Sequence, residues 1–197
     1  YFFDLMDGSF NSFRSSECKF GYRDSLFKGS NMIITHIEFK SNLEKKLCLS
    51  YGSLHKKIND ISLDKKFLNP QIISKLITEI REAALPNPLI EPNAGSFFKN
   101  PIIDINSIKT DHFDLNELII WELENNLVKV GAAKLIQLIK NELPEAHNVS
   151  ISKKHNLVLT TNGIASQQDV INFAKAIQSK VKYYFNINLE IEPRVIL

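Results

Sequence analysis

The ten-residue stretch Pro92-Asn-Ala-Gly-Ser-Phe-Phe-Lys-Asn-Pro101 constrains the structure of this chain more than any other segment. Gly95 tolerates a positive φ and lets the backbone approach a ligand closely, so Ser96 can point into a cleft. The two aromatic residues that follow are apolar enough to anchor the segment in a core. The lysine and asparagine after them offer a cation and an amide, which suit a phosphate or a carboxylate. The alternative is a loop that enters a buried strand, in which Ser96 only satisfies backbone groups.

Three other segments predict helices. In 69–84, Asn69 is expected to cap the helix and Pro70 to occupy its first turn. Pro144 is expected to end a second helix over 131–141, and Ser166 to cap a third over 167–184. The expected inward faces consist of Ile72, Ile73, Leu76, Ile77 and Ile80 in the first helix, Ala132, Leu135, Ile136 and Ile139 in the second, and Val170, Phe173, Ala174, Ile177 and Val181 in the third.

Strands are expected between these helices. Residues 1–13 predict a hairpin about Asp7-Gly8, and 151–159 predict a strand or a strand pair. Alternation within 32–40 predicts a strand with Ile33, Ile34, Ile37 and Phe39 available to a core, and alternation over 187–196 predicts a final strand. The overall pattern is α+β. Leu85-Pro-Asn-Pro88 ends the first helix and marks the expected domain boundary.

Composition excludes several classes of protein. A net charge of +2 without clustered basic runs argues against a nucleic-acid surface. No apolar run approaches the length of a membrane span, and no membrane partner is expected. Cys18 and Cys48 form no metal-ligand pattern, and His36 has no second ligand candidate near it in the sequence, so no metal site is expected. Two packed, reduced thiols are the expected state of the cysteines.

Four segments, taken together and in order, resemble the UDP-N-acetylenolpyruvoylglucosamine reductase family, flavin enzymes of peptidoglycan synthesis. The strongest is the serine stretch, from Asn93 to Pro101. The others are Phe20-Gly-Tyr-Arg-Asp-Ser-Leu-Phe-Lys28, Leu49-Ser-Tyr-Gly-Ser-Leu54 and Leu189-Glu-Ile-Glu-Pro-Arg194. The resemblance implies FAD-dependent, NADPH-linked reduction of UDP-N-acetylglucosamine enolpyruvate to UDP-N-acetylmuramate.

The resemblance also implies roles for individual residues. Ser96 matches the family's proton donor, Arg23 the arginine that polarises the substrate carboxylate, and Glu192 the C-terminal catalytic glutamate. Alternation places Glu190 and Glu192 on the same strand face, so only the resemblance selects between them. Without the resemblance, Arg23 is interpreted equally well as the salt-bridge partner of a nearby carboxylate. Residues that match substrate contacts are Tyr22, Tyr51, Asn100 and, more weakly, His155.

The chain departs from the family's pattern at several positions. Ala84 stands where related enzymes commonly present a phosphate-binding lysine, and Pro92 replaces a glycine. Lys134 replaces a tryptophan, and Pro193 replaces a valine and removes a backbone donor. The glycine-rich FAD loops of the family have no counterpart among the seven glycines. These differences raise the alternative of a non-catalytic portion that only binds the UDP-sugar.

The resulting expectation is an N-terminally truncated member of the family. Residues 1–85 would form part of the second lobe of the FAD-binding domain, to which 187–197 would return, and 86–186 would form the substrate-binding domain. A cytoplasmic protein, monomeric at full length, is expected. The competing hypotheses are a nucleotide-sugar binding module without activity and an unrelated α+β domain.

Overall fold

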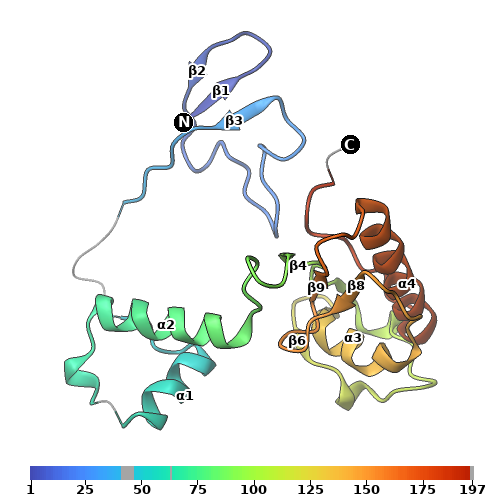
Figure 1. Ribbon diagram of the computed structural model, residues 1–197. Coiled ribbons are helices and arrows are strands. Elements are labelled where there is room, and N and C mark those ends of the chain that lie inside the picture. Colours follow the sequence, from blue (N-terminus) through green and yellow to red (C-terminus); the bar gives the residue numbers. More distant parts are fainter. Residues whose placement is uncertain (41–46, 63, 196–197) are drawn as a thin grey trace. The chain divides into compact units, whose positions relative to one another are not determined.

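The computed structural model describes residues 1–40, 47–62 and 64–195. The chain divides into two compact units, Tyr1–Leu47 and Cys48–Leu197, and each is described by itself (Figure 1). Helices combine with small antiparallel sheets, which confirms the α+β class. The domain boundary predicted at residue 85 does not coincide with the division between these two units, and it stays a prediction. Among the described residues, no helix has the length and apolar character needed to cross a membrane.

The first unit is built on the predicted hairpin. Strands β1 (Phe2–Asp4) and β2 (Phe10–Asn11) pair antiparallel, and β3 (Met32–Ile34) pairs with the other edge of β1. Gly8 has a φ of +71° in the connecting turn, which explains the glycine there. A small aromatic cluster beneath the sheet joins Phe2, Phe13 and Phe27.

The prediction of a long core strand over 32–40 is wrong. Regular strand structure ends at Ile34, and the four residues expected in a core (Ile33, Ile34, Ile37 and Phe39) are all exposed. The physical reason is that β3 lies at an edge of a three-stranded sheet, and the aromatic cluster of this unit forms around Phe2 instead. Cys18 is buried as expected, but Cys48, in the second unit, is exposed, so the expectation of two packed thiols is half wrong.

The second unit begins with a helical hairpin, α1 (Gly52–Asp60) and α2 (Pro70–Ala84), with a short 3-10 turn, η1 (Lys65–Phe67), between them. The predicted cap is confirmed, because the Asn69 side chain accepts a hydrogen bond from Ile72 N at 2.9 Å and Pro70 opens the helix. Ile73 and Leu76 are buried against Leu54 and Ile58 of α1, whereas Ile77 is exposed, contrary to the predicted apolar face.

The main core of the second unit lies between two sheets and two helices. The sheets have the strand orders β4-β9-β8 and β5-β7-β6, and α3 and α4 lie side by side (Figure 1). The strands are β4 (Asn93–Ser96), β5 (Ile102–Asp104), β6 (Ile120–Glu122), β7 (Leu127–Val130), β8 (Val149–Ile151) and β9 (Val158–Thr161). The helices are α3 (Ala132–Ile139) and α4 (Gln167–Phe185), with 3-10 turns η2 (Ile105–Ser107), η3 (Leu115–Glu117) and η4 (Lys140–Glu142).

Local sequence signals in this part are confirmed. The expected strand pair is present as β8 and β9, but it is displaced: residues 152–157, most of the predicted stretch 151–159, form the turn between the two strands. The inward residues of α3 (Ala132, Leu135, Ile136 and Ile139) and most of those of α4 (Phe173, Ala174, Ile177 and Val181) are buried, while Val170 is half-buried. The predicted final strand is not confirmed in the described part of 187–196: Ile187 and Leu189 alternate inward, but the only pairing is an isolated bridge from Ile191 to Phe98.

Helix α4 begins with a capping box that gives a pH-dependent prediction. The backbone N–H and side chain of Ser166 hydrogen-bond the Asp169 carboxylate and hold the pKa of Asp169 below its ordinary value of 3.8. Because the folded-state pKa is lowered, the stabilisation is present above the ordinary pKa and is lost as pH falls through the lowered value. We expect Ser166→Ala to move the Asp169 pKa towards 3.8 and to cost about 1 kcal/mol of unfolding free energy.

Carbon-detected NMR titration of the Asp169 carboxyl, with urea unfolding of the variant at neutral pH, measures both effects. An Asp169 pKa at or above 3.8 in the folded wild-type chain would contradict the capping box.

Candidate functional site

The position of Ser96 is set by a bulge in β4. Asn93 lies opposite Thr160 of β9 and Ser96 lies opposite Val158, so the register shifts between them. Gly95 has a φ of +73° in this interval, and the Asn93 side chain accepts a hydrogen bond from its N–H at 2.9 Å. An extra residue of this kind bends a strand and redirects the side chains that follow. Ser96 is thereby exposed at the end of β4, although its neighbours Phe97 and Phe98 are both buried.

Hydrogen bonds on both sides hold the segment after Ser96. On one side Phe97 N donates to Leu157 O at 2.7 Å. On the other side the segment contacts the C-terminal residues, because Glu192 N donates to Phe97 O at 2.9 Å and Lys99 N donates to Glu190 O at 2.9 Å. The structure therefore brings two of the three predicted catalytic residues, Ser96 and Glu192, to adjacent backbone segments.

The side chain of Glu190, which the sequence could not separate from that of Glu192, is paired with a lysine of the serine stretch. The Lys99 ammonium, whose side chain is 15% exposed, forms an ion pair with the Glu190 carboxylate, whose side chain is 69% exposed. The lysine that the sequence suggested for a phosphate or carboxylate ligand is thus paired within the protein. This contact assigns Glu190 to the link between the two segments, and the role of Glu192 stays a prediction.

The ion pair gives a stability prediction. Glu190→Gln is expected to lower the free energy of unfolding by no more than about 1 kcal/mol, because the glutamate is largely exposed to solvent. Adding Lys99→Met should recover part of that loss, since the double variant no longer leaves a mostly buried ammonium without its carboxylate. Urea unfolding of the single and double variants measures both values. A double variant less stable than Glu190→Gln would contradict this explanation.

Asn100 holds the first turn of α3. Its side-chain oxygen accepts a hydrogen bond from Ala132 N at 3.0 Å. The residue at the N-cap position, Gly131, has no side chain to do this, and a Cβ there would lie 3.1 Å from Cβ of Ile119. The cap therefore comes from 32 residues earlier in the chain. Sequence reasoning missed this structural role, because a local capping pattern cannot reveal a donor–acceptor pair so far apart.

His155 lies in the turn between β8 and β9. Its Nδ1 accepts a hydrogen bond from Leu157 N at 3.2 Å, so a neutral imidazole carries its proton on Nε2. The ring is half-buried, and the residue lies three positions before Val158, the β9 partner of Ser96. His155 therefore lies in the turn that leads into the strand paired with Ser96.

The remaining predicted site residues lie elsewhere in the chain. Tyr22 and Arg23 form the corner of a tight turn closed by Gly21 and Asp24, whose backbone groups bond each other, and Arg23 adopts a φ of +54°. Both belong to the first unit, which is described by itself. Tyr51 directly precedes α1, and its side chain is 72% exposed.

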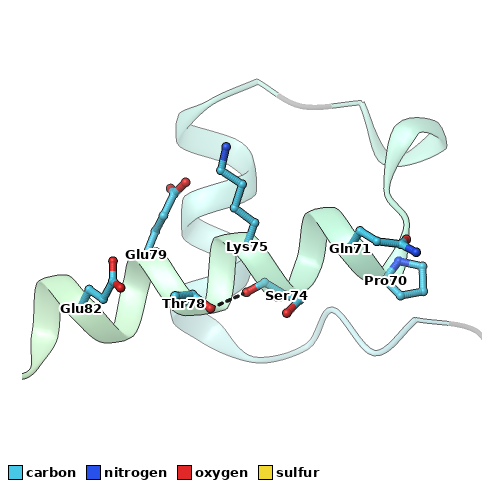
Figure 2. A pocket seen from close by; sticks show the side chains of 7 residues that line it. All are labelled: Pro70, Gln71, Ser74, Lys75, Thr78, Glu79 and Glu82. Carbon is cyan, nitrogen blue, oxygen red and sulfur yellow. Dashed lines mark hydrogen bonds between the residues drawn. The ribbon is translucent and has the colours of Figure 1, made fainter.

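One face of α2 lines a surface hollow, and Figure 2 shows the residues that line it. The lining residues, all from this one helix, are Pro70, Gln71, Ser74, Lys75, Thr78, Glu79 and Glu82. Thr78 Oγ1 bonds the Ser74 carbonyl within the helix at 3.0 Å (Figure 2). The hollow contains no predicted site residue, so we assign no function to it. The described residues also contain no group of His, Cys, Asp and Glu able to hold a metal ion.

Comparisons with known proteins indicate the same family as the resemblance of the serine stretch. The family model for the C-terminal domain of UDP-N-acetylenolpyruvoylglucosamine reductase matches residues 87–196. Curated proteins of that name from Shewanella sediminis and Pseudomonas savastanoi are 33% and 32% identical over 99% and 98% of this chain. One from Flavobacterium johnsoniae is 32% identical over 94%. The chain spans only 56–57% of the length of these relatives.

Proposed function

The chain belongs to the UDP-N-acetylenolpyruvoylglucosamine reductase family, and we propose that it forms the substrate side of a reductase that converts UDP-N-acetylglucosamine enolpyruvate into UDP-N-acetylmuramate for peptidoglycan. The observation that carries the proposal is the bulged β4. It exposes Ser96 while hydrogen bonds fix the next residue to both β9 and the segment that bears Glu192. A hydroxyl held in this way on a rigid sheet would be suited to deliver a proton to one face of the carbanion that hydride addition to a bound alkene leaves.

Each predicted residue has a role in this proposal. Ser96 Oγ donates the proton to the former vinyl group. Glu192 and Arg23 act at the substrate carboxylate, where the planar guanidinium can make two parallel hydrogen bonds. The substrate contacts are assigned to Tyr22, Tyr51, Asn100 and His155. A hydroxyl is a weak acid, so proton donation by Ser96 depends on a strongly basic carbanion and a preorganised site.

The residues of this chain do not provide a phosphate-binding loop for FAD. Its seven glycines are isolated from one another, at positions 8, 21, 29, 52, 95, 131 and 163. The glycine-rich loops that commonly bind dinucleotide phosphates carry closely spaced glycines at a helix N-terminus. FAD and NADPH remain part of the proposal through the family alone, and no step is derived through them. A cytoplasmic location and a monomeric full-length protein belong to the proposal in the same way.

The alternative function is that the chain binds the UDP-sugar without reducing it. Both functions require binding of the same ligand. A binding experiment therefore tests both functions together, and a turnover measurement distinguishes one from the other.

Calorimetric titration of the chain with UDP-N-acetylglucosamine enolpyruvate tests the proposal. We expect saturable heat below millimolar ligand, and weaker binding of UDP-N-acetylglucosamine, which lacks the carboxylate. The absence of heat at millimolar enolpyruvyl ligand would contradict both functions. Equal affinity for the two ligands would contradict recognition of the substrate carboxylate by Arg23.

A further inference from the structure

The last turn of α2 lacks the backbone donors that a longer helix would provide. In a continuing helix the carbonyl of residue i accepts from the N–H of residue i+4. For Glu82 that donor would belong to Pro86, and for Ala84 to Pro88, and neither proline has an N–H. The sequence that ends the helix therefore also leaves carbonyl oxygens at its C-terminus in need of another donor.

Lys154 supplies that donor from a distant part of the chain. Its ammonium donates to Glu82 O and to Leu85 O, at 3.3 Å each, across 72 and 69 residues. A cation at the C-terminus of a helix also interacts favourably with the helix dipole. The Lys154 ammonium thus donates to Glu82 O in place of the backbone N–H that Pro86 lacks.

The backbone around Lys154 is itself well anchored. Lys154 N donates to the Ser152 hydroxyl at 3.2 Å, and Ser152 is 2% exposed. Ser152 N donates to Val158 O, and Val158 N donates to His155 O. Because Val158 is the β9 partner of Ser96, the lysine is held by the same sheet that carries the proposed proton donor.

We propose that Lys154 is a positioning residue that clamps the end of α2 to the β8–β9 turn. The clamp holds the α1–α2 hairpin, with Tyr51 at its start, at a fixed distance from the sheet that bears Ser96. Among the described residues, the apolar cluster within the hairpin and the cluster within the two sheets share no buried member, so no continuous core of these residues sets this distance. The consequence for substrate binding rests on the proposed function; the clamp itself does not.

Three variants of the chain test this inference. Lys154→Met removes the ammonium but keeps a long side chain, Lys154→Arg keeps a cation, and Lys153→Met is the control, because Lys153 is exposed in the same turn. Amide hydrogen exchange in 82–85 measures the clamp. We expect exchange there to become roughly five- to tenfold faster in Lys154→Met, which lies within the net contribution of a typical intramolecular hydrogen bond. Lys154→Arg and Lys153→Met should stay within about twofold of wild type.

Titration with UDP-N-acetylglucosamine enolpyruvate measures the consequence. We expect Lys154→Met to weaken binding by a similar factor, and Lys154→Arg to restore it. Unchanged exchange in Lys154→Met would overturn the clamp. Faster exchange with unchanged affinity would overturn the positioning role. If the wild-type chain does not bind the ligand, the proposed function fails and the positioning role for this substrate fails with it, while the exchange result still decides whether the clamp exists.

Discussion

Replacing Phe98 with alanine is expected to lower the free energy of unfolding of the second unit by about 3–5 kcal/mol, the range for truncating a buried aromatic side chain. Phe98 is 1% exposed and lies in the main core cluster, with its ring edge-on to Phe97 at 5.4 Å between centroids. Its backbone also bridges to Ile191. The substitution therefore leaves a cavity at the point where the serine segment meets the C-terminal residues.

Urea unfolding followed by Trp121 fluorescence measures this loss. Phe67→Ala is the control, because Phe67 is 60% exposed in η1 and its truncation should change stability by less than about 0.5 kcal/mol. A cost below about 1 kcal/mol for Phe98→Ala would mean that this ring does not anchor the site.

Replacing Ser96 with alanine is expected to slow turnover by roughly 10²–10⁴-fold, the usual contribution of a positioned proton donor. Affinity for the enolpyruvyl substrate should change by less than about threefold, because a proton donor acts mainly in the transition state. Oxidation of NADPH by the proposed FAD-containing reductase, of which this chain forms the substrate side, measures turnover, and calorimetry of the chain measures binding. The expectation applies to the reductase that we propose.

Ser179→Ala provides a matched control for this experiment, because Ser179 is an exposed serine on α4. It should leave both turnover and affinity unchanged. Equal losses of affinity and turnover in Ser96→Ala would make Ser96 a substrate contact. Turnover within tenfold of wild type would remove it as the proton donor.

Sequence reasoning succeeded where the determining interactions are local. Asn69 caps α2 and Ser166 caps α4 as predicted, because a cap and its helix lie within four residues of each other. The predicted turn at Asp7-Gly8 follows from a glycine that tolerates a positive φ, here +71°. The serine stretch pointed to a loop that leads into a core, and both of its aromatic residues are buried.

The remaining features depend on contacts between distant segments. Consecutive burial of Phe97 and Phe98 needs neighbours on both sides of the segment, which no alternation pattern encodes. The pairing of Glu190 with Lys99, the capping of α3 by Asn100 and the bonds of Lys154 to α2 join residues 32 to 91 positions apart. The predicted strand over 32–40 had the right alternation, but alternation alone cannot supply the layer that would cover it.

Mapping of backbone amide shifts by NMR, as UDP-N-acetylglucosamine enolpyruvate is added to the chain, tests the central claim most directly. The account predicts saturable shifts concentrated at Ser96, Asn100, His155 and Glu192, with Arg23 affected in the first unit. Shifts that saturate but lie only elsewhere, such as along the hollow on α2, would contradict the proposed site, and no shifts at millimolar ligand would contradict the proposed substrate.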